Sequence, residues 1–116
     1  MKLKRQVTGV DISIKLHELR FTKPSLFYRE WTGAKENEIE SWKDNKAWYG
    51  VDNVNCYTVA ELIDYIYSVT KESFWMYHNA GEYLLQYGMN EGNYSDPNLA
   101  NCYAQYIIEK LLDQPL

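Results

Sequence analysis

The sequence has little of the material from which metal and catalytic sites are usually built. Its 116 residues include two cysteines and two histidines. Cys56, Cys102, His17 and His78 contain no close-spaced pair of the kind that structural zinc sites use. The six glycines form neither a P-loop nor a dinucleotide fingerprint. An enzyme would need a pocket that joins residues distant in the chain, so we expect no metal, no cofactor and no catalytic activity.

Two further scarcities bear on where the protein acts. No apolar run approaches the ~20 residues that a membrane span needs. The first residues, Met1 to Arg5, are not followed by the apolar segment of a signal peptide. We therefore expect a cytoplasmic location without membrane contact. There, both cysteines stay reduced and pack as small apolar side chains, instead of forming the one disulfide that they permit.

Basic residues are scarce beyond the start of the chain. The net charge is −4, and residues 1–23 hold six basic and two acidic side chains, which leaves six basic and fourteen acidic for the remainder. The basic start is able to touch phosphate, but the acidic remainder would repel a duplex. We therefore expect no general nucleic-acid binding.

Aromatic residues are abundant. They make up 16% of the chain, and eleven of them are tyrosines, whose rings pack while the hydroxyl seeks water or a partner. Tyrosine and tryptophan are also enriched at interface hot spots. Two interpretations stay open: the tyrosines border the core of a small domain, or some of them face a partner.

The most informative segment is a predicted hairpin, Phe74 to Tyr87, joined by the turn Asn79-Ala80-Gly81. With His78 opposite Glu82, which we interpret as a surface pair, strand alternation defines two faces. One face gathers Trp75, Tyr77, Tyr83, Leu85 and Tyr87, and the other gathers Phe74, Met76, Leu84, His78, Glu82 and Gln86. Because both faces are apolar, either the protein covers both or one aromatic face is kept for a partner.

Three helices are predicted. Thr58 and Glu61 form a capping box that starts a helix reaching about Lys71, with Val59, Leu62, Ile63, Ile66 and Val69 as its buried stripe. A last helix, capped by Asp96 with Pro97 in its first turn, runs to Leu112. Residues 10–20 fit either a strand or a helix. We predict a helix there, with Thr8 and Asp11 as its start signal.

The strands between these helices are harder to define. Residues 25–31 predict an aromatic strand, and 47–51 a short further one within a long acidic insertion, 32–55. The whole chain is expected to be one α+β domain, with residues 1–7 frayed. About three helices pack on a small antiparallel sheet of three to four strands, in the order helix, strand, short strand, helix, hairpin, helix. Trp42 and Trp48 are candidates to lie over the hairpin.

Four segments carry a resemblance: Ile14–Phe21, Pro24–Tyr28, Tyr57–Leu62 and Tyr103–Leu112. Their order resembles a set of small uncharacterised accessory proteins from phages and prophage-like elements of gut bacteria. The resemblance implies a small α+β domain that acts in the cytoplasm of a bacterial host. It supplies no catalytic residues.

Two functions are therefore expected as alternatives. The first is a non-enzymatic protein that binds and modulates a host bacterial protein, of the anti-defence or host-takeover type. The second is a small-ligand or nucleotide-sequestering protein with an aromatic pocket. The candidate binding residues are Trp75, Tyr77, Tyr83, Tyr87, Trp42 and Trp48. Where apolar sheet surface stays uncovered, two copies of the chain could bury it against each other, so a homodimer is also expected.

Overall fold

The computed structural model describes residues 6–21, 23–30, 39–41, 53–71, 74–87 and 92–112. In chain order these residues form helix α1 (Val10–Glu18), strands β1 (Phe27–Glu30), β2 (Ile39–Ser41) and β3 (Asn53–Cys56), helix α2 (Val59–Thr70), strands β4 (Phe74–Asn79), β5 (Glu82–Tyr87) and β6 (Gly92–Asp96), helix α3 (Leu99–Tyr106) and a π-helical stretch, η2 (Ile107–Leu112). The predicted α+β class is confirmed.

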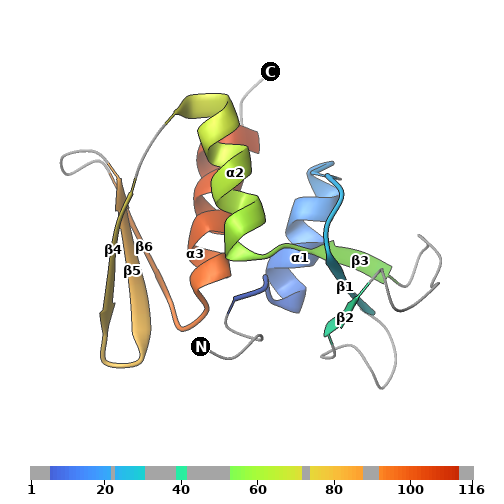
Figure 1. Cartoon of the computed structure of the whole chain (residues 1–116), viewed down its shortest axis with the longest axis horizontal. Coiled ribbons are helices and arrows are strands. Elements are labelled where there is room, and N and C mark those ends of the chain that lie inside the picture. The colour runs from blue at the N-terminus through green and yellow to red at the C-terminus, as the bar shows by residue number, and fades with distance from the viewer. Residues whose placement is uncertain are drawn as a thin grey trace.

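The strands are divided between two antiparallel sheets, where one was expected. The strand orders are β2-β1-β3 and β4-β5-β6. Helices α2 and α3 stand side by side between the sheets, with the β4-β5-β6 sheet on one side and α1 with β1, β2 and β3 on the other (Figure 1). The division arises because β1 pairs with β3, a strand directly before α2, and not with the hairpin.

Helix α2 begins where the capping box predicts. The Glu61 amide donates to Thr58 Oγ1 at 3.2 Å, and the Thr58 amide donates to Glu61 Oε1 at 2.9 Å. Of the predicted stripe, Leu62 and Ile66 are buried, but Ile63 and Val69 are 41% and 55% exposed. The stripe is therefore narrower than its spacing indicates, because α3 covers only part of it.

The other two helices are capped by different residues from those predicted, although α1 begins at Val10 as expected. The first segment is a helix, as predicted. Its N-cap is Gly9, which has no side chain with which to cap the helix. The Thr8 hydroxyl instead lies 2.7 Å from the Ser13 hydroxyl. Helix α3 is capped by Asn98, whose side chain accepts from the Asn101 amide, and not by Asp96. Asp96 acts one step earlier, by accepting from the Asn98 amide.

Several predictions fall on residues that the structure does not describe. Trp42, Trp48 and the predicted strand 47–51 lie outside the described residues, as do residues 1–5. The aromatic strand is present as β1, two residues shorter at its start than predicted. The expected fraying does not extend to Val7, which is fully buried and forms an isolated bridge with Thr58.

The main core lies between α2, α3 and the inner face of the β4-β5-β6 sheet. Phe74 packs its ring edge-on against Tyr106 and Tyr103, with ring centroids 4.9 and 5.6 Å apart. Leu85 from β5 and Ile107 from the start of η2 are fully buried in the same cluster. One face of the hairpin is therefore used by the fold itself.

Candidate functional site

The hairpin turn determines which side chains share a face. Strands β4 and β5 are joined by two residues, Ala80 and Gly81, both with positive φ, 53° and 80°. Asn79 is therefore paired with Glu82, and His78 with Tyr83. The predicted three-residue turn with His78 opposite Glu82 is wrong. Two left-handed turn residues match the right-handed twist of the strands, which favours the shorter connection.

This difference of one position moves one strand's side chains to the other face relative to its partner. On the inner face, Phe74, Met76 and His78 are now opposite Tyr87, Leu85 and Tyr83. On the outer face, Trp75 and Tyr77 are opposite Gln86 and Leu84. The predicted grouping of Trp75 and Tyr77 with Tyr83, Leu85 and Tyr87 is thus replaced by a grouping with Leu84 and Gln86.

Tyr83 is not a surface residue, contrary to its selection as a binding candidate. Its side chain is 6% exposed, and its ring stacks on His78 with centroids 4.4 Å apart and an interplanar angle of 13°. Tyr87 pairs with Phe74, and its side chain is outside the described part of the chain. Of the six candidates, only Trp75 and Tyr77 are therefore observed on the surface.

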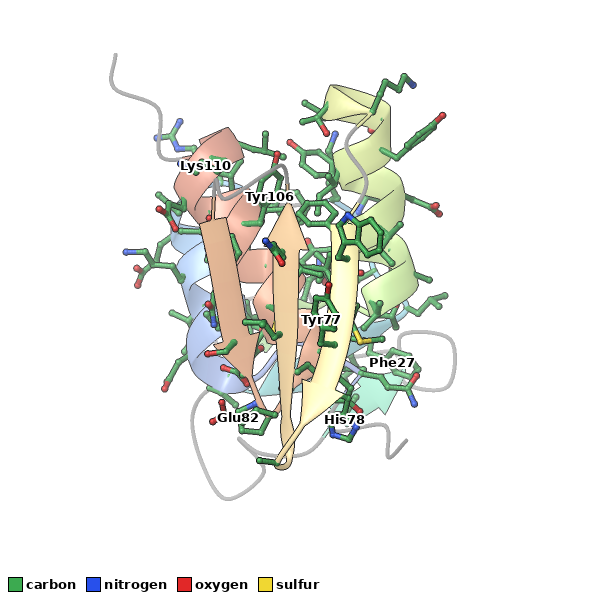
Figure 2. The ribbon with its side chains drawn as sticks, turned by 90° about the vertical axis from the view of Figure 1, so that its left-hand side faces the viewer. Phe27, Tyr77, His78, Glu82, Tyr106 and Lys110 are labelled. Carbon is green, nitrogen blue, oxygen red and sulfur yellow. The ribbon has the colours of Figure 1, made fainter. Side chains whose placement is uncertain are left out.

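The outer face of the β4-β5-β6 sheet carries these two rings. Trp75 is 68% exposed and Tyr77 is 48% exposed, beside a half-buried Leu84. Figure 2 looks onto this face, with α2 and α3 behind the strands. A sheet that packs on helices from one side usually shows polar side chains to water on the other. Here the solvent side carries two large aromatic residues, so it is the candidate site.

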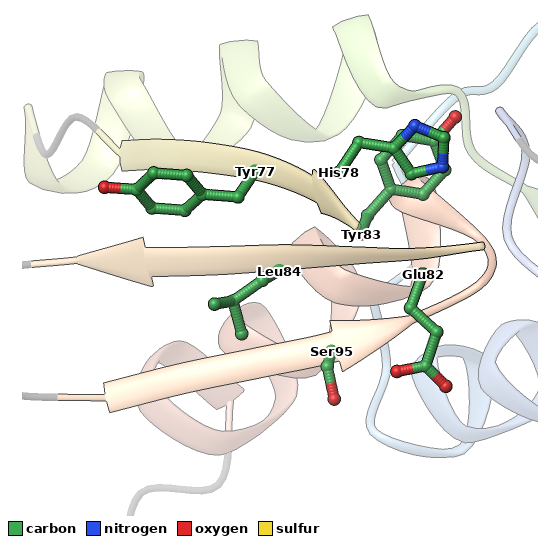
Figure 3. A pocket seen from close by; sticks show the side chains of 6 residues that line it. All are labelled: Tyr77, His78, Glu82, Tyr83, Leu84 and Ser95. Atoms are coloured by element: carbon green, nitrogen blue, oxygen red, sulfur yellow. The ribbon is translucent and has the colours of Figure 1, made fainter. Parts of the chain in front are cut away.

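A shallow depression lies at the hairpin end of this face (Figure 3). Its volume is about 560 Å³, and the residues that line it are Tyr77, His78, Glu82, Tyr83, Leu84 and Ser95. Sequence reasoning did not place Leu84 and Ser95 here, because the pairing of β6 with β5 brings Ser95 opposite Leu84. The lining consists of two tyrosines and a leucine, with the imidazole of His78, the hydroxyl of Ser95 and the carboxylate of Glu82. His78 and Tyr83 contribute to it from the inner face of the sheet.

The described residues offer little to nucleophilic or metal chemistry. Among them, no group of three His, Cys, Asp or Glu side chains is arranged to hold a metal ion. Cys56 and Cys102 are buried free thiols. Burial, and secondarily the charge of Asp96, raises the pKa of Cys102 to about 12. Its Sγ also donates to the Tyr83 carbonyl at 3.5 Å, so this thiol is a poor nucleophile near neutral pH.

Within the described residues, none of the helices has the length and apolar character to traverse a lipid bilayer.

Comparison of the chain with protein-family models, with curated proteins and with solved structures finds no match.

Proposed function

We propose that this is a non-enzymatic binding protein that holds another protein on the outer face of its β4-β5-β6 sheet. A single observation carries the proposal. Trp75 and Tyr77 are 68% and 48% exposed, although the opposite face of the same sheet is already packed against α3. The fold gains little from large rings on the solvent side, since Tyr94 and Leu85 fill the core side. A partner that covers the rings would give them an energetic role.

The chemistry of this face suits a protein partner. Tryptophan and tyrosine are the residues most often found as interface hot spots, where truncating one costs about 2 kcal/mol or more of binding free energy. Gln86 is half-buried, while Glu82 and Ser95 are exposed near the hairpin end. A central pair of rings with polar side chains around it is the usual organisation of a protein interface.

The choice of a host bacterial protein as partner is supported by the resemblance to phage and prophage-like accessory proteins. A protein of this kind acts by occupancy, one molecule for each target. Modulation of the target then requires that the covered surface of the host protein be one that it uses.

A second candidate function, small-ligand binding, is favoured by the depression around Tyr77 and Leu84. Its volume of about 560 Å³ is within the range of ligand pockets. Nucleotides are disfavoured as ligands, because the described residues of its lining include the carboxylate of Glu82 and no lysine or arginine to bind phosphate. We expect millimolar mono- and cyclic nucleotides to leave the melting temperature unchanged. A rise with any of them would favour this second function over the first.

The protein-binding proposal is tested by affinity capture from a bacterial lysate with three baits. These are the wild-type chain, the double variant Trp75→Ser/Tyr77→Ser, and the control Leu26→Ser. Leu26 is 62% exposed and precedes β1, on the far side of the helix pair. Because all three side chains are exposed, we expect each variant to keep the wild-type circular dichroism spectrum.

The expected result is one protein retained by the wild type and by Leu26→Ser, and reduced at least tenfold on the double variant. Equal retention by all three baits, at salt concentrations from about 50 to 500 mM, would show that the rings do not form the binding site. Retention of nothing above an empty resin would reject the proposal altogether.

A further inference from the structure

The exposed apolar residues of β4 extend over both of its faces. Trp75, Met76 and Tyr77 are consecutive, and they are 68%, 47% and 48% exposed. Because strand side chains alternate, Met76 lies on the inner side of the sheet and its neighbours lie on the outer side. A partner lying flat on the outer face would cover the two rings and leave Met76 in water. A strand placed along the edge of β4 would cover all three.

The main chain of β4 is arranged to accept such a strand. Among the described strands, the order β4-β5-β6 places β4 at an edge of its sheet. The two-residue turn makes Asn79–Glu82, Tyr77–Leu84 and Trp75–Gln86 the hydrogen-bonded pairs of the hairpin. The amide and carbonyl groups of Met76 and His78 therefore point away from β5. Residues 74–79 contain no lysine, acid or proline, which are the residues that normally block an edge.

Helix α2 also has apolar surface on this side. Tyr65 contacts Phe21, at the end of the α1 segment, with ring centroids 4.8 Å apart. Ile63 is two residues earlier, about 200° around the helix, and so faces the sheet side. It is 41% exposed, and Tyr67, one turn later, is 57% exposed. In Figure 2, α2 stands behind β4 and extends outside it, where a further strand of the sheet would pass.

We propose that a second copy of this chain supplies that strand. Two β4 strands pair antiparallel about a two-fold axis at Met76, so that the two three-stranded sheets become one sheet of six strands. Met76 exchanges both main-chain hydrogen bonds with Met76 of the partner subunit. Trp75 then stands opposite Tyr77 of the partner subunit in a non-hydrogen-bonded pair, where facing side chains are closest. The same pair occurs twice, once on each side of the axis.

The residues of β4 are therefore complementary to themselves in this register. Phe74 and His78 of the partner subunit are opposite each other on the inner face. No like charges meet along the strand, because none of its residues is acidic or basic apart from His78. The net charge of −4 on each copy is distributed elsewhere and is screened over about 8 Å at physiological salt.

The area available sets the expected strength. A fully buried aromatic side chain covers about 150–250 Å². At the exposed fractions of Trp75 and Tyr77, the two rings offer roughly 250 Å² per copy. With Met76, the strand edges and the apolar side of α2, the two copies together bury about 1,000 Å², which is near the lower limit for a specific interface. We therefore expect a dissociation constant in the micromolar range.

Sedimentation equilibrium at about 1–200 μM tests the proposal. It compares the wild type with variants that carry a positive or a negative charge at position 76, on the proposed two-fold axis. The wild-type mass is expected to rise with concentration from 13.7 kDa toward twice that value. Met76→Lys places two ammonium groups opposite each other, and Met76→Glu two carboxylates, so each variant alone is expected to stay monomeric. An equimolar mixture is expected to regain the dimer. Leu26→Lys adds the same charge at a distant exposed leucine and is expected to dimerise like the wild type.

A crosslinking measurement keeps the test decisive if a charged variant fails to fold. Hydrogen-bonded pairs have Cα atoms about 5.5 Å apart, a separation that a disulfide spans. Met76→Cys is expected to form a covalent dimer under mild oxidation, while Leu26→Cys is not, because position 26 lies away from the proposed two-fold axis. The native Cys56 and Cys102 are buried in the fold and do not compete.

The proposal is overturned by a wild-type chain that remains monomeric at 200 μM, or by a dimer that tolerates both charged variants. A mixture of the two charged variants that fails to associate also rejects the two-fold at Met76. These charged variants leave Trp75 and Tyr77 in place, so they test the dimer without removing the rings that the capture experiment removes. A monomeric chain that still retains a partner through its rings would reject the dimer and keep the proposed function.

Discussion

Tyr77 and Tyr83 are the same residue type in the same hairpin, yet one is half-exposed and the other is 6% exposed. Neither the residue type nor the alternation of side chains along a strand distinguishes the two tyrosines. The distinction arises from two turn residues, Ala80 and Gly81, which set the register and thereby the face of every side chain in β5. Assigning a strand residue to a binding face therefore requires that the turn of the hairpin be predicted correctly.

Cys102 provides a prediction at the scale of one residue. Burial raises the pKa of its thiol from 9.0 to about 12, so between these pH values the folded chain keeps a proton that the unfolded chain releases. The stabilisation that comes from burying the neutral thiol is therefore fully present below pH 9. The free energy of unfolding then falls as the pH rises from 9 toward 12. The pKa of Tyr103 is raised, first by burial and then by Cys102, and acts in the same direction.

Urea unfolding at pH 8 and pH 10.5 measures this effect. The wild type is expected to lose more stability between the two pH values than Cys102→Ala does. The variant is expected to start about 1 kcal/mol lower at pH 8, because it leaves a small cavity. Parallel losses in both chains would mean that the thiol has no part in the alkaline weakening.

At the scale of elements, the hairpin turn is open to improvement. Ala80 has a φ of 53°, a conformation that costs an L-residue roughly 1–2 kcal/mol and that asparagine adopts more readily. We expect Ala80→Asn, which creates an Asn-Gly turn, to raise the free energy of unfolding by about 0.5–1 kcal/mol, measured by urea denaturation.

Gly81 provides the opposite change at the neighbouring position. A Cβ there would meet no atom within 4 Å, so any effect of Gly81→Ala comes from its φ of 80° alone. The loss is expected to be about 1 kcal/mol or more. Stabilisation by Gly81→Ala, or destabilisation by Ala80→Asn, would contradict the two-residue turn and with it the assignment of the faces.

Among the elements, those defined by local chemistry were predictable and those defined by pairing were not. Thr58 and Glu61 each accept a hydrogen bond from the other's amide within four residues, so the start of α2 could be predicted from the sequence. Strand β3 was missed because Asn53-Val54-Asn55-Cys56 is only four residues long and half of it is asparagine, a residue depleted in strands. Asn55 is nevertheless buried, since its side-chain amide donates to the Lys23 carbonyl at 3.0 Å, a partner thirty-two residues away.

For the whole molecule, the segment Gln6–Gly9 links the starts of both central helices. The Val59 amide of α2 donates to the Gln6 carbonyl at 3.0 Å. On the other side, the Asn98 side chain donates to the Val7 carbonyl at 2.8 Å, while its oxygen caps α3. A contact between residues 91 positions apart therefore holds the helix pair to the first segment.

Asn98 is accordingly expected to matter beyond its own helix. Asn98→Ala removes the cap and leaves the fully buried Val7 without this donor, so we expect a loss of about 1–3 kcal/mol in the free energy of unfolding. Asn98→Asp keeps an acceptor for the Asn101 amide but loses the donor to Val7. An intermediate loss is therefore expected in the same urea titration. If Asn98→Asp is as stable as the wild type, the link to Val7 contributes nothing.

The α+β class, the start of α2 and the presence of aromatic residues on both faces of the hairpin could be predicted from local sequence patterns. These depend on capping and side-chain alternation, which act over a few residues. The burial of Tyr83 toward α3, the exposure of Trp75 and Tyr77, and the edge position of β4 among the described strands became known only from the folded chain. The reason is physical: which face is buried depends on the turn geometry and on which helices pack behind the sheet, and strand order depends on contacts between distant segments.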